Sequence, residues 1–184
     1  MPTIITHTLI GVLSASTYSL KEYKKRFWFF SVLLPIIPDF DVIGFYFNIS
    51  YSHFFGHRGF FHSIPFAFLL SIIIVLFFFR GVRFLSLKSN LLIIYFGLLT
   101  SSHGIFDAMT NGGLGVALLS PFNTNRIFLP FTPIEVSPLG LQAFFSRRGL
   151  EVILSELYYL WLPFILIFLL TLIFKKRTNK SEKI

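Results

Sequence analysis

The sequence predicts an all-α fold: a small polytopic α-helical membrane protein with about five membrane segments and a partly re-entrant lid at 111–150. Hydrophobic residues make up 54% of the 184 residues, and 26 residues are phenylalanine, well beyond what the core of a soluble domain needs. Short clusters of Lys and Arg separate the apolar runs, which is typical of the basic anchors that flank membrane segments. We therefore treat residues 1–174 as a single membrane-embedded domain and residues 175–184 as a basic cytoplasmic tail.

The apolar runs cover residues 4–20, 27–37, 62–79, 91–109 and 157–174. The last three are predicted to span a membrane unaided, because 18 residues at ~1.5 Å per residue cover most of a ~30 Å hydrocarbon core. The second run is expected to end inside the membrane, where Pro35 and Pro38 interrupt helical hydrogen bonding. Residues 111–150 contain Asn111-Gly112-Gly113, four prolines and a pair of arginines, so they predict an interfacial lid or a re-entrant segment.

The basic residues predict an orientation. Three clusters, at 21–26, 80–88 and 175–183, hold 12 of the 16 Lys and Arg residues. If all three clusters are cytoplasmic, five segments alternate correctly and the N-terminus is outside the cell membrane. No Lys or Arg precedes the first apolar run and His7 interrupts it, so we expect this run to be retained rather than cleaved as a signal peptide.

Composition also limits the chemistry. The chain has no cysteine, so any metal ion must be held by nitrogen and oxygen ligands. The net charge of +8 does not predict a nucleic-acid partner, because the positive charges lie in short clusters rather than on one continuous face.

All three aspartates and all five histidines lie before residue 108, within or beside the apolar runs. Ionisable side chains at membrane depth are costly and usually functional. Counted from the basic anchors at helical rise, His7, Asp39, His62 and His103 reach a similar depth of roughly 18–27 Å. Four segments would thus deliver Asp and His, which are ligands for Zn²⁺ and similar ions, to one site in the outer half of the bilayer.

Two pairs of residues have a spacing that can bring both side chains to one centre. His103 and Asp107 are four residues apart in an apolar helix and would share one face, either as metal ligands or as a hydrogen-bonded pair that fastens two helices. Asp39 and Asp41 follow Pro38 and would point to one side of an extended chain, with a cation or a shared proton between them. The alternative for the second pair is an exposed turn at the end of a helix.

The segment from His57 to Ser63 contains two further candidate ligands. His57 and His62 converge if the chain turns at Gly59, and Ser63 is placed to cap the following helix. Arg58 suits an anionic substrate group or, alternatively, a lipid headgroup. His53 is expected to lie near the site or at the membrane interface rather than to bind the metal. His7 stands alone in its apolar run, but its predicted depth matches that of the other candidates, which supports it as a ligand.

Read in order, His7, Pro38-Asp39-Phe40-Asp41, His57 to Ser63, Ser102 to Thr110 and Ser120-Pro121-Phe122 resemble the bacterial and archaeal YdjM-like family, described as membrane-bound, metal-dependent hydrolases. The resemblance covers roughly residues 1–140; Phe61 departs from it, where a small polar residue is expected. The order of His and Asp ligands also resembles, more distantly, the zinc-dependent phospholipase C and P1-type nuclease group, although the Trp-based N-terminal ligand and the additional histidines of that group are missing.

The residues and the resemblance together predict a membrane-embedded metal-dependent hydrolase domain that cleaves a phosphoester, such as a lipid or lipid-linked phosphate, with a metal-activated water. The expected cofactor is one or two divalent ions, Zn²⁺ first, with Mn²⁺ or Mg²⁺ as alternatives. Asp39, Asp41 and Arg58 are the candidate catalytic residues. The candidate metal ligands are His7, Asp39, Asp41, His57, His62, His103 and Asp107. The alternatives are a transporter that handles protons or metal ions, and a metal-stabilised membrane protein without catalysis.

Overall fold

The computed structural model describes residues 1–18, 22–138 and 141–181. Lys21 and Lys183, which belong to the predicted basic clusters, lie outside these ranges. The described residues form α-helices, two 3₁₀ segments (η1 and η2) and one π-helical segment (η3), with two isolated β-bridges and no strand. The all-α prediction is therefore confirmed.

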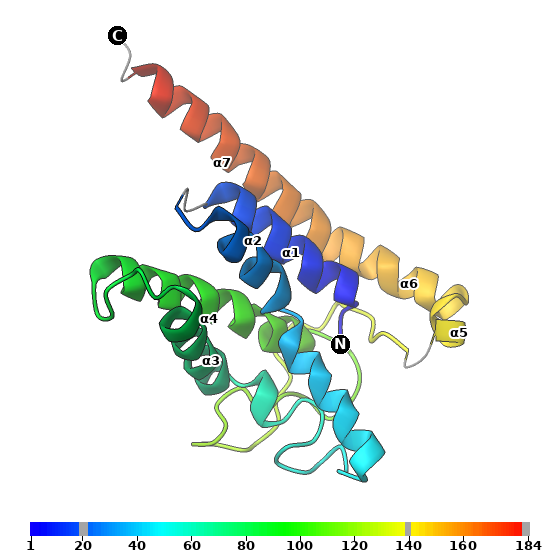
Figure 1. Ribbon diagram of the computed structural model, residues 1–184. Coiled ribbons are helices and arrows are strands. Elements are labelled where there is room, and N and C mark those ends of the chain that lie inside the picture. Colours follow the sequence, from blue (N-terminus) through cyan, green and yellow to red (C-terminus); the bar gives the residue numbers. More distant parts are fainter. Residues whose placement is uncertain (19–21, 139–140, 182–184) are drawn as a thin grey trace.

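The elements follow the predicted apolar runs. They are α1 (Ile4–Thr17), α2 (Lys24–Leu33), η1 (Ile37–Phe47), η2 (Phe60–His62), α3 (Ile64–Phe78), α4 (Leu87–Ala108), α5 (Leu141–Phe144), α6 (Arg147–Glu156), η3 (Leu157–Trp161) and α7 (Leu162–Ser181). Figure 1 shows that α6, η3 and α7 run on as one long rod, with α1 beside it and the α3–α4 pair on the other side of α2.

Among the described residues, two helical stretches are long and apolar enough to cross a membrane: Leu87–Ala108 and Arg147–Lys175. A third candidate is the pair α2 and η1, which is bent by 48° and corresponds to a broken span or a re-entrant loop. The prediction that residues 62–79 span unaided is wrong. Helix α3 has only 15 residues, because η2 forms a separate turn and the Ser63 side chain accepts the Phe66 N–H to begin a new helix.

The predicted lid is shorter than 111–150. Residues 147–156 form α6, the first part of the last long helix, rather than part of the lid. Residues 109–138 cover the end of α4 and the segment from His57 to Ser63. Backbone hydrogen bonds join Ala117 to Arg58, Ile64 to Leu118 and Leu129 to Ala108, so this segment is fixed over the place where the polar residues meet.

Aromatic side chains fill the core between α2, α3 and α4. The buried members include Phe27, Phe30, Phe79 and Phe96, with Leu34 and Leu92 beside them. A second apolar group, with Ile10, Leu99 and Leu160, joins α1 and α4 to η3. These two groups pack α1, α2, α3, α4 and η3 together, and the Asp and His residues lie where α1, η1, η2 and α4 meet.

Candidate metal centre

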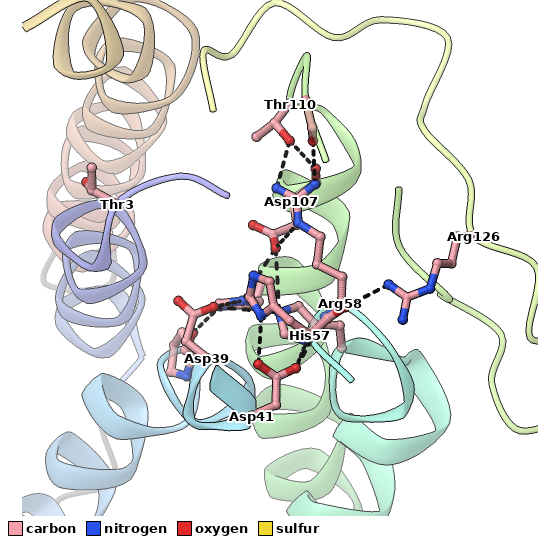
Figure 2. A network of polar contacts seen from close by, with 12 residues as sticks. Thr3, Asp39, Asp41, His57, Arg58, Asp107, Thr110 and Arg126 are labelled. Carbon is pink, nitrogen blue, oxygen red and sulfur yellow. Dashed lines mark hydrogen bonds and ion pairs between the residues drawn. The ribbon is translucent and has the colours of Figure 1, made fainter. Parts of the chain in front are cut away.

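The Asp and His residues from separate elements meet at one buried position. Asp39 comes from η1, His62 from η2, and His103 and Asp107 from α4, and one ligand atom from each lies within 4.8 Å of the others. Figure 2 shows Asp39, Asp41 and Asp107 directed toward a common centre, with His57 and Arg58 beside it. This juxtaposition was the central expectation from the sequence.

Four atoms define the centre of the cluster. Nε2 of His103 is 3.2 Å from Oδ1 of Asp39 and 3.9 Å from Oδ2 of Asp107, and Nε2 of His62 is 3.6 Å and 3.5 Å from the same two oxygens. Ligands of a tetrahedral Zn²⁺, at ~2.0–2.2 Å from the ion, are roughly 3.4 Å apart. The spacing of the four atoms therefore fits one such ion.

The same atoms lack hydrogen bonds. Nε2 of His62, Nε2 of His103, Oδ1 of Asp39 and both carboxylate oxygens of Asp107 are buried without a hydrogen-bond partner. An unpartnered buried polar atom costs roughly 1–3 kcal/mol, and more if it is charged. Several such atoms at one position form a set of ligands that fits a bound cation.

Outer contacts orient both imidazoles. Nδ1 of His103 lies 2.7 Å from the carbonyl oxygen of Pro35, and Nδ1 of His62 lies 3.0 Å from Oδ2 of Asp41. When each Nδ1 carries the proton and is directed at these oxygens, Nε2 keeps its lone pair and faces the centre, which is the usual arrangement of a metal-binding histidine.

The local sequence explains why the Pro35 carbonyl is available. The residue three positions later, Pro38, has no N–H, and the Asp39 N–H donates to Ile36 instead. The carbonyl of Pro35 is thereby left for His103. The proline break that was predicted to end the second apolar run thus also supplies a partner for a ligand.

Asp39 and Asp41 do not lie in extended chain, so the geometry expected for Asp-x-Asp is wrong. They lie in the 3₁₀ segment η1, which begins one residue before Pro38 and has about three residues per turn. The two carboxylates do not share one face; they approach opposite nitrogens of the His62 ring, Asp39 at Nε2 and Asp41 at Nδ1. His62 therefore lies between them.

Asp41 has a full set of partners. Its Oδ1 is 2.7 Å from Nδ1 of His57, and its Oδ2 accepts the backbone N–H of Arg58 at 3.2 Å. Asp41, His57 and His62 also form a second group that could hold an ion. The sequence had placed Asp41 and His57 among the ligands, and the structure brings both next to the centre.

Arg58 is buried and held on several sides. Its Nε lies 3.2 Å from Oδ2 of Asp107, Nη1 donates to the Gly112 carbonyl and Nη2 to the Thr110 hydroxyl. The residue has a positive φ of 62°, uncommon for a residue with a side chain. Arg58 thus fixes the Asp107 carboxylate, and its expected contact with an anionic substrate group stays a prediction.

Close helix approach brings His62 to α4. An added Cβ at Gly104 would lie 2.2 Å from the His62 carbonyl oxygen, so glycine is needed at this position. The preceding residue is His103, and this close approach places the imidazoles of His62 and His103 with their ring centroids 4.7 Å apart.

His7 and His53 take different places. His7 is fully buried and stacks on His103 with ring centroids 3.9 Å apart, but it belongs to neither group of candidate ligands. Neither of its ring nitrogens has a hydrogen-bond partner, so its role as a ligand stays a prediction. His53 is exposed, and its Nδ1 accepts the Phe55 N–H, in agreement with a position outside the ligand set.

A small cavity of about 180 Å³ opens beside the cluster. It is lined by Met1, Tyr51, His57, Arg58, Gly113, Val136 and Ser137. Burial raises the pKa of Tyr51 above its ordinary value, so the phenol keeps its proton and can act as a hydrogen-bond donor. His57 and Arg58 therefore line a space that a small molecule can enter.

A second buried polar cluster was missed from the sequence. Glu156 is fully buried and accepts hydrogen bonds from the Thr3 N–H, the Thr3 hydroxyl and the Thr6 hydroxyl at 2.5–2.6 Å. The indole N–H of Trp161 donates to the same Thr6 hydroxyl. A lone acidic residue just before an apolar run was the available signal, because such a residue needs a partner at membrane depth.

Comparison with known proteins agrees with this architecture. The model of the YdjM inner membrane protein family matches residues 1–179. The chain belongs to the YdjM inner membrane protein family. The inner membrane protein YbcI of Escherichia coli (strain K12) is 37% identical over 165 residues, which cover 89% of this chain and 92% of that relative. No solved structure matches the chain. Its apolar helices and its family together identify a membrane protein.

Proposed function

We propose that this protein is a membrane-embedded, metal-dependent hydrolase that cleaves a phosphoester. One observation carries the proposal: Nε2 of His62, Nε2 of His103 and the carboxylates of Asp39 and Asp107 meet in a buried place without hydrogen bonds. Two carboxylates at this distance need a cation or a shared proton to be stable. A mixed set of two nitrogen and two oxygen ligands suits Zn²⁺, with Mn²⁺ as the nearest alternative.

We assign one ion to Asp39, His62, His103 and Asp107. A divalent ion bound there would act as a Lewis acid toward a phosphoryl oxygen and would lower the pKa of a water molecule. Nδ1 of His62 is already paired with Asp41, which favours the role of Asp41 as an orienting partner of His62 over direct ligation. His7 is the next candidate, because its ring lies against His103 with both nitrogens unpaired.

The side chains around the ion site supply binding and proton transfer. Asp39 lies at the edge of the cluster with 9% of its surface exposed, so in this proposal it accepts the proton of the attacking water. Arg58 and Tyr51 line the adjoining cavity and provide donors for the anionic oxygens of the phosphate group. Arg58 also keeps the Asp107 carboxylate in place through its Nε.

The packing supports hydrolysis over transport of protons or metal ions. Transport needs a polar route from the ligand cluster to both membrane faces. In the direction of the basic ends of α2 and α3, large aromatic side chains such as Phe30, Phe79 and Phe96 pack against one another. The cavity beside His57 is lined by residues of the lid segment and by none of these aromatic side chains.

We further propose that the cavity faces the extracytoplasmic side and that the C-terminus is cytoplasmic. The chain has no cysteine, so Asn48→Cys and Lys25→Cys each introduce the sole thiol. Both positions are exposed, and they lie at opposite ends of the bent pair α2 and η1. A membrane-impermeant thiol reagent on intact cells should label the variant at 48 and not the variant at 25; the reverse pattern would invert the orientation.

The direct test combines metal analysis with a substrate screen. Protein purified in detergent should contain about one zinc ion per chain, and the zinc-loaded protein should release alcohol or phosphate from aryl phosphate esters. The variant His103→Gln should lose both properties while its circular dichroism spectrum stays helical. Protein that carries no transition metal after growth with added zinc, or that leaves all phosphate esters intact when loaded, would refute the proposal.

A further inference from the structure

The first observation is a second cavity that adjoins the one beside the ligand cluster. Its volume is about 360 Å³, and it lies between the start of α1, residues 137–138 and α5. Met1 and Ser137 line both cavities, so the two share a wall. Figure 1 shows the N-terminal end of α1 close to the α5–α6 end of the long rod.

The two cavities differ in chemistry. The remaining lining of the larger cavity is mostly apolar and consists of Pro2, Thr3, Ile4, Ile5, Pro138 and Phe144. The smaller one presents Tyr51, His57 and Arg58. An apolar compartment beside a cationic one, with the candidate metal ligands behind the second, fits a molecule with a hydrocarbon chain and an anionic head.

The position of the larger cavity also favours a molecule from the bilayer. Ile4 and Ile5, which form part of its wall, are half-exposed on α1, so the wall continues into the lipid-facing surface of the protein. Helix α6 follows α5 directly and is amphipathic, with Arg147 and Glu151 near Leu150 and Leu154 on its exposed surface. Such a helix is typical of the boundary between headgroups and acyl chains.

We infer that the substrate is an amphiphilic phosphoester whose hydrocarbon chain occupies the larger cavity while its phosphate group reaches the cavity beside Arg58 and His57. The inference rests on the proposed function, whose substrate class it narrows. Entry from the side, along α1, would let such a molecule keep its chain in an apolar environment throughout. For an alkyl phosphate that enters from water instead, each methylene buried in the cavity can improve binding by up to about fourfold.

Photo-crosslinking in lipid nanodiscs tests the occupant without need for turnover. The probe is hexadecyl phosphate with a diazirine at the far end of the chain, and the control probe is the corresponding alcohol. We expect the phosphate probe to label peptides from residues 1–5 and 137–144 at least tenfold more than the alcohol does. Equal labelling by both probes, or labelling spread evenly over lipid-facing helices, would overturn the inference.

A matched pair of variants tests the cavity itself. Ile5→Trp fills the apolar cavity, and Leu69→Trp adds the same side chain at another half-exposed position, on α3. Across alkyl phosphates from butyl to hexadecyl, KM should fall with chain length in the wild type and in Leu69→Trp and should become nearly independent of chain length in Ile5→Trp. An unchanged dependence in Ile5→Trp would also overturn the inference.

The two proposals fail in different ways. Cleavage of a water-soluble aryl phosphate by zinc-loaded protein, with no specific labelling of the apolar cavity, would refute the amphiphilic substrate and leave the hydrolase standing. Specific labelling by the phosphate probe, with every phosphate ester left intact, would refute the hydrolase and leave the cavity as a site for an amphiphilic phosphate.

Discussion

Two clusters of buried polar residues lie beside α1, and they differ in how their polar atoms are satisfied. In the cluster around Glu156, both carboxylate oxygens accept hydrogen bonds from Thr3 and Thr6. In the cluster around Asp107, both carboxylate oxygens of that residue are buried without a hydrogen-bond partner. The two acids are equally buried, so burial alone does not separate a structural acid from a functional one.

The difference lies in what each cluster needs to be stable. The charge of Glu156 is compensated by donors from its own chain, and the result joins α1 to the end of α6. The charge of Asp107 is compensated in part by Arg58, and it still faces Asp39 through the two imidazoles. The cluster around Asp107 keeps polar atoms that could bind a cation, whereas the polar atoms of the Glu156 carboxylate are satisfied within the protein.

Asp107→Asn should give the largest effect. The substitution keeps size and one acceptor oxygen but removes the negative charge that balances a cation in a low-dielectric site. We expect activity to be abolished and zinc content to fall to background, measured by elemental analysis of folded protein. Glu156→Gln, the same change at the other buried acid, is the matched control and should keep its zinc. Equal zinc in both variants would remove Asp107 from the ligands and erase the distinction between the clusters.

Removal of the metal should produce the next largest effect. Without a cation, Asp39 and Asp107 repel one another, so a chelator should lower the midpoint of thermal unfolding. Restored zinc at about 100 times its dissociation constant should add ~2.7 kcal/mol to the free energy of unfolding. Differential scanning fluorimetry in detergent measures this, and Asp107→Asn should respond much less to zinc. A wild-type protein with the same midpoint in chelator and in zinc would mean that the cluster around Asp107 is also stable without metal.

Substitution of Glu156 should change the stability of the protein rather than its metal content. Glu156→Leu leaves the Thr3 N–H and two hydroxyls without their acceptor, which should cost about 1–3 kcal/mol of unfolding free energy. Gln keeps an acceptor oxygen, so Glu156→Gln should lose less. Denaturation in mixed micelles gives these values, with zinc per folded chain measured alongside. Loss of zinc at full stability would show that this cluster acts on the metal centre directly.

Local sequence rules predicted the all-α class, the apolar runs and the convergence of His62, His103 and Asp107 with Asp39. These predictions succeeded because hydropathy and the i,i+4 spacing of a helix are local properties of the chain. Of the seven predicted ligands, six lie in the two groups that could hold an ion, and His7 lies outside both groups with its ring stacked on His103.

The predictions that failed concern features of the structure that long-range packing determines. The 3₁₀ conformation of Asp39 and Asp41 and the short α3 depend on tertiary contacts that periodicity does not show. Residues 147–156 do have the periodicity of an amphipathic helix, but Arg147 and Arg148 excluded them from a predicted apolar span. The pairing of Glu156 with Thr3 and Thr6 joins positions about 150 residues apart, so no local pattern reveals it. Sequence spacing therefore identified the Asp and His residues that converge and missed the contacts that orient them.

His53→Ala should give the smallest effect, and it tests the boundary of the metal cluster. His53 is the one histidine of the five that is exposed; its Nδ1 accepts only the neighbouring Phe55 N–H, and its contact with Arg126 uses the backbone carbonyl, which alanine keeps. Removal of a partner that orients a metal ligand typically costs ~10–100-fold, so a loss well below tenfold in kcat/KM with unchanged zinc is expected here. A loss of zinc in this variant would place His53 at the ion despite its exposure. In that case an unpartnered, buried side chain would no longer be the mark that separates ligands from the residues around them.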